Sequence, residues 1–170
     1  IRGASGDKPY TLGKYESSRI RAAIAELAAN GGVPMGFYTR FTDPAARKVI
    51  TQYYQFIQRH DAIYRRNRSH AEAVLLFPRK SVHAGDVGPV EAFRQTGRAL
   101  LDRHVLFDIL PDDLAAADRL SGYSKVYKAG DGAQEGQAKF FAPPTVRVSA
   151  SRPATGDALH FHLVNYNRTE

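Results

Sequence analysis

The chain has 170 residues, with 24 Lys and Arg against 17 Asp and Glu, and no Cys. This length suits one domain or two small ones, and the absence of Cys excludes disulfides, thiolate nucleophiles and Cys-based metal sites. No stretch approaches the roughly 18 apolar residues of a membrane span, so we expect no membrane partner.

The positive charge is concentrated in the first half of the chain. Residues 1–80 carry 14 Lys and Arg against 6 Asp and Glu, whereas residues 81–170 carry 10 against 11. Such an excess can bind phosphate groups, or it can complement the carboxyl ends of helices. No aromatic–glycine motif, Cys/His spacing or helix-turn-helix pattern accompanies it, so we do not expect a nucleic-acid partner.

The first 66 residues predict an alternation of strands and helices. Residues 8–15 read as an extended segment, and a helix follows from Ser17 or Ser18 to about Ala29, where glycines stop it. Residues 33–39 have the apolar character of a short buried strand. A second helix is predicted over 43–66, because Asp43 is a good N-cap and Pro44 suits the first turn.

The rhythm changes after residues 67–70. A nearly continuous apolar run over 71–77 indicates a buried parallel strand, followed by a loop over 78–89 and a helix over 90–103. The run at 104–110 predicts the next strand, so that strand, helix and strand form one parallel unit.

The last part of the sequence predicts three more strands. Residues 123–127 are expected to add a third strand, and the Gly-rich stretch 129–139 reads as a loop. Residues 145–150 and 159–164 alternate apolar and polar side chains around a Pro–Gly turn, which predicts an antiparallel hairpin lying apart from the parallel sheet. Each hairpin strand has one apolar face that needs cover.

Both ends of the sequence suggest a piece of something longer. The only Met is Met35, so Ile1 is not a natural translation start, and the chain stops directly after a strand pattern. We therefore expect a fragment of a larger protein, or a chain from which segments are missing.

The order of these motifs resembles the C-terminal part of a multidomain glycoside hydrolase. The phrase Ala25-Glu26-Leu27-Ala28-Ala29-Asn30-Gly31-Gly32 is similar to the helix between the seventh and eighth strands of a (β/α)8 sugar-hydrolase barrel. Phe77-Pro78 with Ser81-Val82-His83, and the run from His104 to Pro111, resemble the Rossmann-like trimerisation domain of three-domain beta-galactosidases, which is related in fold to glutamine amidotransferases. The hairpin resembles the start of a β-sandwich.

The resemblance implies an α/β protein in three parts. Residues 1–68 would close a TIM-like barrel, 69–130 would form a Rossmann-like domain, and 131–170 would be a linker and the start of a β-sandwich. The match departs from the beta-galactosidase pattern after Tyr127, where further strands and helices are missing. Amidotransferase activity is excluded, because that reaction needs a Cys nucleophile. The implied partners are carbohydrate and further copies of the chain.

Glu16 is the candidate catalytic residue. The resemblance places it at the end of the seventh barrel strand, where the carboxylate nucleophile of these hydrolases lies. The alternative is a Glu that stabilises a helix N-terminus. Its partner acid would come from a strand that this chain lacks, so the chain alone is expected to be inactive. Tyr38 and Arg40, after the eighth strand, are candidate substrate-binding residues with Asp43, or they serve the loop.

Four other polar residues favour structural roles. Glu26 reads as a surface carboxylate, and His83 with Asp86 reads as part of a loop without a phosphate fingerprint. His160 and His162 share a strand face, but no third ligand accompanies them, so we predict no metal site and no cofactor.

Two classes of function remain open. The chain is either part of a glycoside hydrolase-like protein or a noncatalytic interaction and oligomerisation module with a basic surface. The presence or absence of six preceding βα units would discriminate them.

Overall fold

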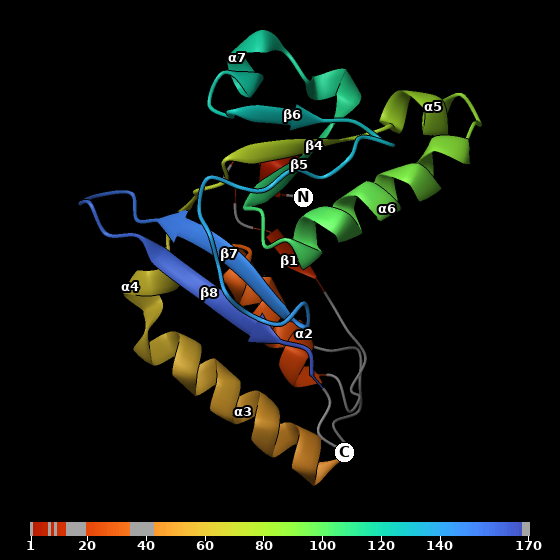
Figure 1. Cartoon of the computed structure of the whole chain (residues 1–170). Coiled ribbons are helices and arrows are strands. Elements are labelled where there is room, and N and C mark those ends of the chain that lie inside the picture. Colours follow the sequence, from red (N-terminus) through yellow and green to blue (C-terminus); the bar gives the residue numbers. More distant parts are fainter. Residues whose placement is uncertain (1, 7, 9, 13–19, 35–42, 168–170) are drawn as a thin grey trace.

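The structure, a computed structural model, describes residues 2–6, 8, 10–12, 20–34 and 43–167. It is a mixed α/β arrangement that contains two parallel sheets and one antiparallel sheet (Figure 1). The described residues form no closed barrel. None of the helices in this part of the chain is both long enough and apolar enough to cross a membrane.

The predicted parallel unit near the N-terminus is confirmed. Strand β1 (Tyr10–Leu12) pairs in parallel with β2 (Gly32–Pro34), and helix α2 (Ile20–Ala29) lies between them in the chain. Gly31 follows the helix with φ of 79°, a left-handed conformation that suits glycine and ends the helix.

The long helix predicted over 43–66 is instead two helices. Asp43 caps α3 (Pro44–Arg59) as expected, since its carboxylate accepts from Ala45 N at 2.9 Å, but the helix ends at His60 and α4 (Asp61–Tyr64) follows. The break changes the direction of the chain, and the Tyr64 ring then lies 5.6 Å from that of His162. The core of this region lies between α2 and α3, around Ile20, Ile24 and Ile50.

The second parallel sheet matches its prediction closely. Strands β4 (Ala73–Phe77), β5 (Phe107–Pro111) and β6 (Lys125–Tyr127) are ordered β5–β4–β6, and both neighbours run parallel to β4. Helix α6 (Gly88–Asp102) connects β4 to β5. Leu75 and Leu100 are fully buried between sheet and helix, because the strand is apolar on both faces and the helix presents an apolar stripe.

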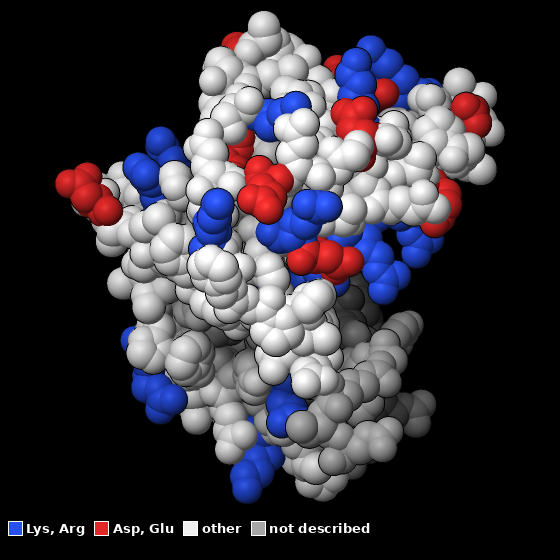
Figure 2. Space-filling model, in the orientation of Figure 1, with Lys and Arg blue, Asp and Glu red and all other residues white. Residues whose placement is uncertain are grey.

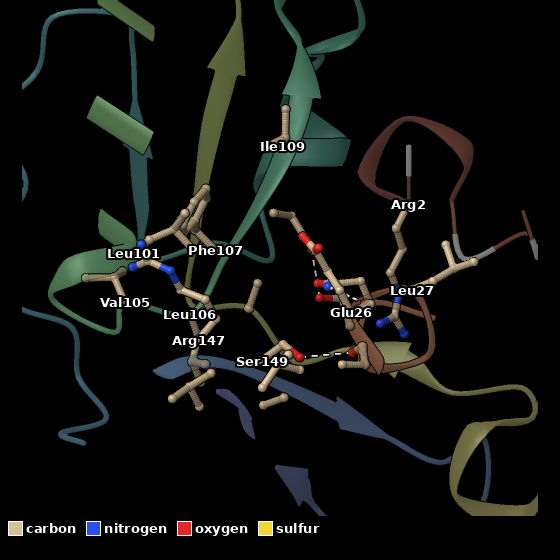
Figure 3. A pocket seen from close by; sticks show the side chains of 18 of the residues that line it. Arg2, Glu26, Leu27, Leu101, Val105, Leu106, Phe107, Ile109, Arg147 and Ser149 are labelled. Carbon is tan, nitrogen blue, oxygen red and sulfur yellow. Dashed lines mark hydrogen bonds between the residues drawn. The ribbon is translucent and has the colours of Figure 1, made fainter. Parts of the chain in front are cut away.

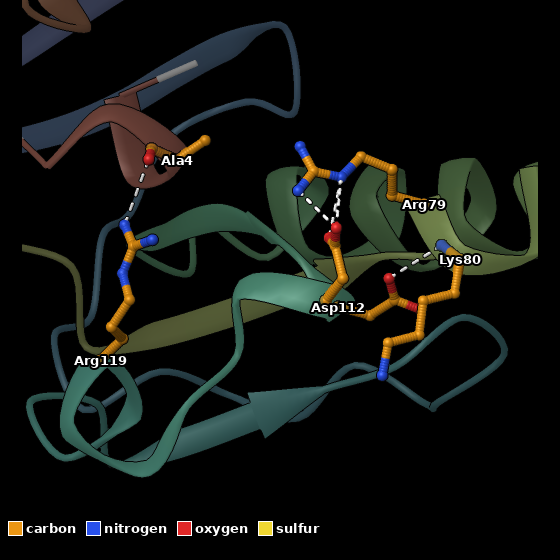
Figure 4. A network of polar contacts seen from close by, with 6 residues as sticks. Ala4, Arg79, Lys80, Asp112 and Arg119 are labelled. Carbon is orange, nitrogen blue, oxygen red and sulfur yellow. Dashed lines mark hydrogen bonds and ion pairs between the residues drawn. The ribbon is translucent and has the colours of Figure 1, made fainter. Parts of the chain in front are cut away.

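The predicted loop over 78–89 contains the short helix α5 (Arg79–His83), so that part of the prediction was wrong. Polar contacts hold the helix, which explains why no apolar periodicity announced it. Arg79 Nε donates to Asp113 Oδ1 at 2.8 Å, and Lys80 N donates to Asp112 Oδ1 at 3.1 Å (Figure 4). Both acids begin the 3-10 turn η1 (Asp112–Leu114), which precedes α7 (Ala117–Leu120).

The C-terminal hairpin forms as predicted and lies outside both parallel sheets. Strands β7 (Val146–Arg152) and β8 (His160–Asn165) are antiparallel, and β3 (Arg68–Ser69) pairs with the other edge of β7. The apolar face is covered only in part. Val148 is buried against Leu106, whereas Leu163 is 64% exposed.

The N-terminal helix α1 (Arg2–Ser5) packs against the edge strand β5. A Cβ at Gly3 would lie 2.3 Å from the carbonyl oxygen of Ile109, so only glycine allows this approach. The Arg119 guanidinium donates to the carbonyls of Gly3 and Ala4, which ties α7 to α1 (Figure 4).

Candidate functional site

The three residues predicted from the resemblance, Glu16, Tyr38 and Arg40, lie outside the described residues. The strands that precede them are described. β1 ends at Leu12 and β2 ends at Pro34, and these two residues are partners in the parallel register. The carboxyl ends of the two strands therefore lie side by side.

The other polar candidates have structural roles. Asp43 caps α3, and Asp86 accepts from Gly88 N at 2.9 Å, which shapes the turn before α6. His83 is an exposed residue at the end of α5. The crevice beyond β4 and β5, where Rossmann-like folds bind ligands, is bridged by the Arg79–Asp113 ion pair.

The histidines on β8 contact protein side chains. His162 Nε2 lies 3.1 Å from the Ser151 hydroxyl, and its ring packs against Tyr64. Burial lowers the pKa of His162, and the nearby His160 and Arg2 lower it further. Across the described part of the chain, no group of three or more His, Cys, Asp or Glu could hold a metal ion.

The largest concave feature is an open cleft of about 1080 Å³ between the two parallel units. One wall comes from the end of α6 and from β5, the opposite wall from α2, and the base from β7 (Figure 3). The labelled apolar side chains of the first wall are Leu101, Val105, Leu106, Phe107 and Ile109. The cleft thus has an apolar side and a polar side, which is typical of small-molecule sites.

The α2 side of the cleft is rich in polar groups. The Tyr10 hydroxyl donates to Asn30 O at 3.1 Å, and burial is the main cause that raises its pKa. Glu26, which we predicted to be a surface carboxylate, is exposed but lines this cleft. Burial and a hydrogen bond to Glu26 raise the pKa of Tyr166 well above the ordinary range, so that its hydroxyl stays protonated.

Further polar groups line the base and the β5 wall. Arg147 NH1 donates to Asp102 at 2.8 Å, and the Ser149 hydroxyl donates to Ala29 O at 2.9 Å. The Asp108 carboxylate accepts from the hydroxyls of Ser69 at 2.8 Å and Tyr123 at 2.9 Å. Each acid of the cleft therefore has a partner within the protein.

Sequence reasoning missed this cleft. Its polar residues come from β1, α2, β5 and β7 and from the segment after β8, and no short motif joins them. The only local signal is Asp108, an acidic residue inside an otherwise apolar strand.

Comparison with known protein families, curated proteins and solved structures finds no match to this chain in any of the three.

Proposed function

We propose that this chain is part of a glycoside hydrolase-like protein and contributes the last strands and helices of its barrel. The observation that carries the proposal is the parallel pairing of β1 and β2 across α2, with α3 following. A three-stranded parallel sheet and an antiparallel hairpin come next, in the order that the resemblance implies. Two parallel strands need further strands on their open edges to close a barrel.

In this proposal Glu16 is the nucleophile, and Tyr38 and Arg40 bind the sugar. Glu16 and Tyr38 each stand four positions beyond the paired residues Leu12 and Pro34 in the sequence. Catalytic groups of (β/α)8 enzymes come from the carboxyl ends of the strands. The carboxylate attacks the anomeric carbon, a second carboxyl group protonates the leaving oxygen, and water then releases the sugar.

The test is Glu16→Gln in the longer protein that carries the second carboxyl group. The substitution keeps the shape but removes the nucleophile, so hydrolysis of aryl glycosides should fall by orders of magnitude, at about 1.4 kcal/mol per tenfold. Glu135→Gln is the matched control, because Glu135 is an exposed residue of the loop before β7. Unchanged hydrolysis in Glu16→Gln would reject the assignment.

The second candidate function is a noncatalytic module that assembles through its basic surface. Over the lower part of the molecule, where α3 lies, Figure 2 shows only Lys and Arg among the coloured side chains of the described residues. Light scattering tests this candidate. If the α3 surface joins copies of the chain, the double substitution Arg47→Glu and Lys48→Glu should dissociate them, as should added salt.

A further inference from the structure

The charges that line the cleft balance one another. Three acidic residues, Glu26, Asp102 and Asp108, face three arginines, Arg2, Arg98 and Arg147. The acids are also engaged by Tyr166, by Arg147, and by Ser69 with Tyr123, respectively. A ligand with a net charge would find no excess of opposite charge here, so the lining favours a neutral ligand.

Several cleft groups retain hydrogen-bonding capacity after these contacts. A carboxylate has about four acceptor positions, and the hydroxyls of Tyr10 and Ser149 still accept after donating to Asn30 and Ala29. The guanidinium of Arg147 has five N–H donors, and Asp102 takes only part of them. Donors and acceptors therefore alternate along the polar side.

The opposite side offers apolar contact area. Phe107 and Leu101 line it, and Ile109 is 40% exposed. Figure 3 shows these side chains across the cleft from Glu26. A ligand that matches both sides has an apolar face and an edge of closely spaced hydroxyls, and a sugar ring has both.

We propose that this cleft binds an uncharged sugar unit at a site separate from the carboxyl ends of β1 and β2. The ring lies with one face on Phe107 and the neighbouring apolar side chains, and its hydroxyls bond to Glu26, Tyr166 and Arg147. The inference goes beyond the proposed function, because it requires no hydrolysis and uses none of Glu16, Tyr38 and Arg40.

The absence of Trp from the sequence allows a direct test in the 170-residue chain. Thr145 is an exposed residue that lines the cleft, so Thr145→Trp places a single indole beside the site. We expect titration with galactose or lactose to change its emission, with a dissociation constant on the order of millimolar. Thr51→Trp, on the exposed side of α3, is the matched control and should not respond.

Ligand class and contact residues are tested on the same reporter. Adding Tyr166→Phe should weaken lactose binding about tenfold, whereas Tyr53→Phe, on α3 outside the cleft, should not change it. Glucuronate and galactose 6-phosphate should bind more weakly than galactose. The proposal is rejected if no neutral sugar changes the Thr145→Trp emission, if the anions bind more tightly, or if Tyr166→Phe binds as well as its parent.

This outcome is separable from that of the proposed function. Glu16→Gln should leave the reporter response intact while it abolishes hydrolysis in the longer protein. A sugar response without any hydrolysis would retain the binding site and reject the catalytic assignment.

Discussion

The two parallel units of this chain bury their apolar residues in different places. In the sheet of β4, β5 and β6, the side chains of Val74, Leu75 and Leu100 are fully buried. In the pair of β1 and β2, Leu12 is 51% and Val33 is 56% exposed. The same strand–helix–strand connection thus gives a sheet with a core in one unit and an open pair of strands in the other.

The difference shows that helix packing, not the sheet, stabilises the first unit. α2 packs on α3 through Ile20, Ile24 and Ile50, and it is also contacted by β8. Two paired strands cannot bury enough surface alone, so α2 obtains its cover from elements outside its own sheet. Three substitutions test this division, and their expected effects decrease in the order given.

The largest effect is expected for Leu100→Ala. Leu100 fills the interface between α6 and the parallel sheet, and its truncation leaves a cavity in a closely packed core, so the free energy of unfolding should fall by about 2–5 kcal/mol. Urea denaturation measures the change. Leu12→Ala, the same substitution in β1, should cost less than about 0.5 kcal/mol. Equal losses would show that β1 is packed as tightly as the α6 interface.

A smaller effect is expected for Gly3→Ala. The added Cβ would meet the Ile109 carbonyl at 2.3 Å, so α1 must move away from β5, at a cost of about 1–3 kcal/mol in denaturation experiments. Gly122→Ala is the control, because its Cβ would meet nothing within 4 Å. No difference between the two variants would mean that α1 is not docked on β5.

The smallest effect concerns acid and the hairpin face that contains His162. Burial holds the pKa of His162 below its unfolded value of about 6.5, so the unfolded chain takes up this proton first. Stability is present above pH 6.5 and is lost as the pH falls below it. Melting temperatures between pH 7.5 and 5 should fall less in His162→Gln than in the unchanged chain. The control His60→Gln replaces an exposed histidine and should retain the full fall.

The sequence predicted the fold best where apolar residues alone decide it. The run at 71–77 and the stripe at 90–103 led to the correct parallel sheet, and the alternation at 145–150 led to the hairpin. It failed where polar contacts between distant residues decide. α5 depends on Asp112 and Asp113, and the end of α3 at His60 accompanies a contact of Tyr64 with β8.

The candidate site was less predictable for the same reason. Tyr10, Asp108 and Tyr166 meet across the cleft only because three separate elements bring them together. Nothing local in the sequence distinguishes Tyr166 from the other tyrosines. The residues taken from the resemblance, Glu16, Tyr38 and Arg40, remain predictions.

The pairing of β3 with β7 has a consequence for how the chain could be rearranged. The chain leaves this sheet after Ser69 and returns to it at Val146, where His70 N still donates to Ala150 O at 3.0 Å. Residues 70–145 are thus an insertion whose two ends meet, the geometry that tolerates excision and transplantation. Each halving of a connecting loop changes its closure free energy by only about 0.6 kcal/mol. A short linker in place of the insertion would therefore leave β3 and β7 free to pair, and the excised unit could be grafted between neighbouring strands of another protein.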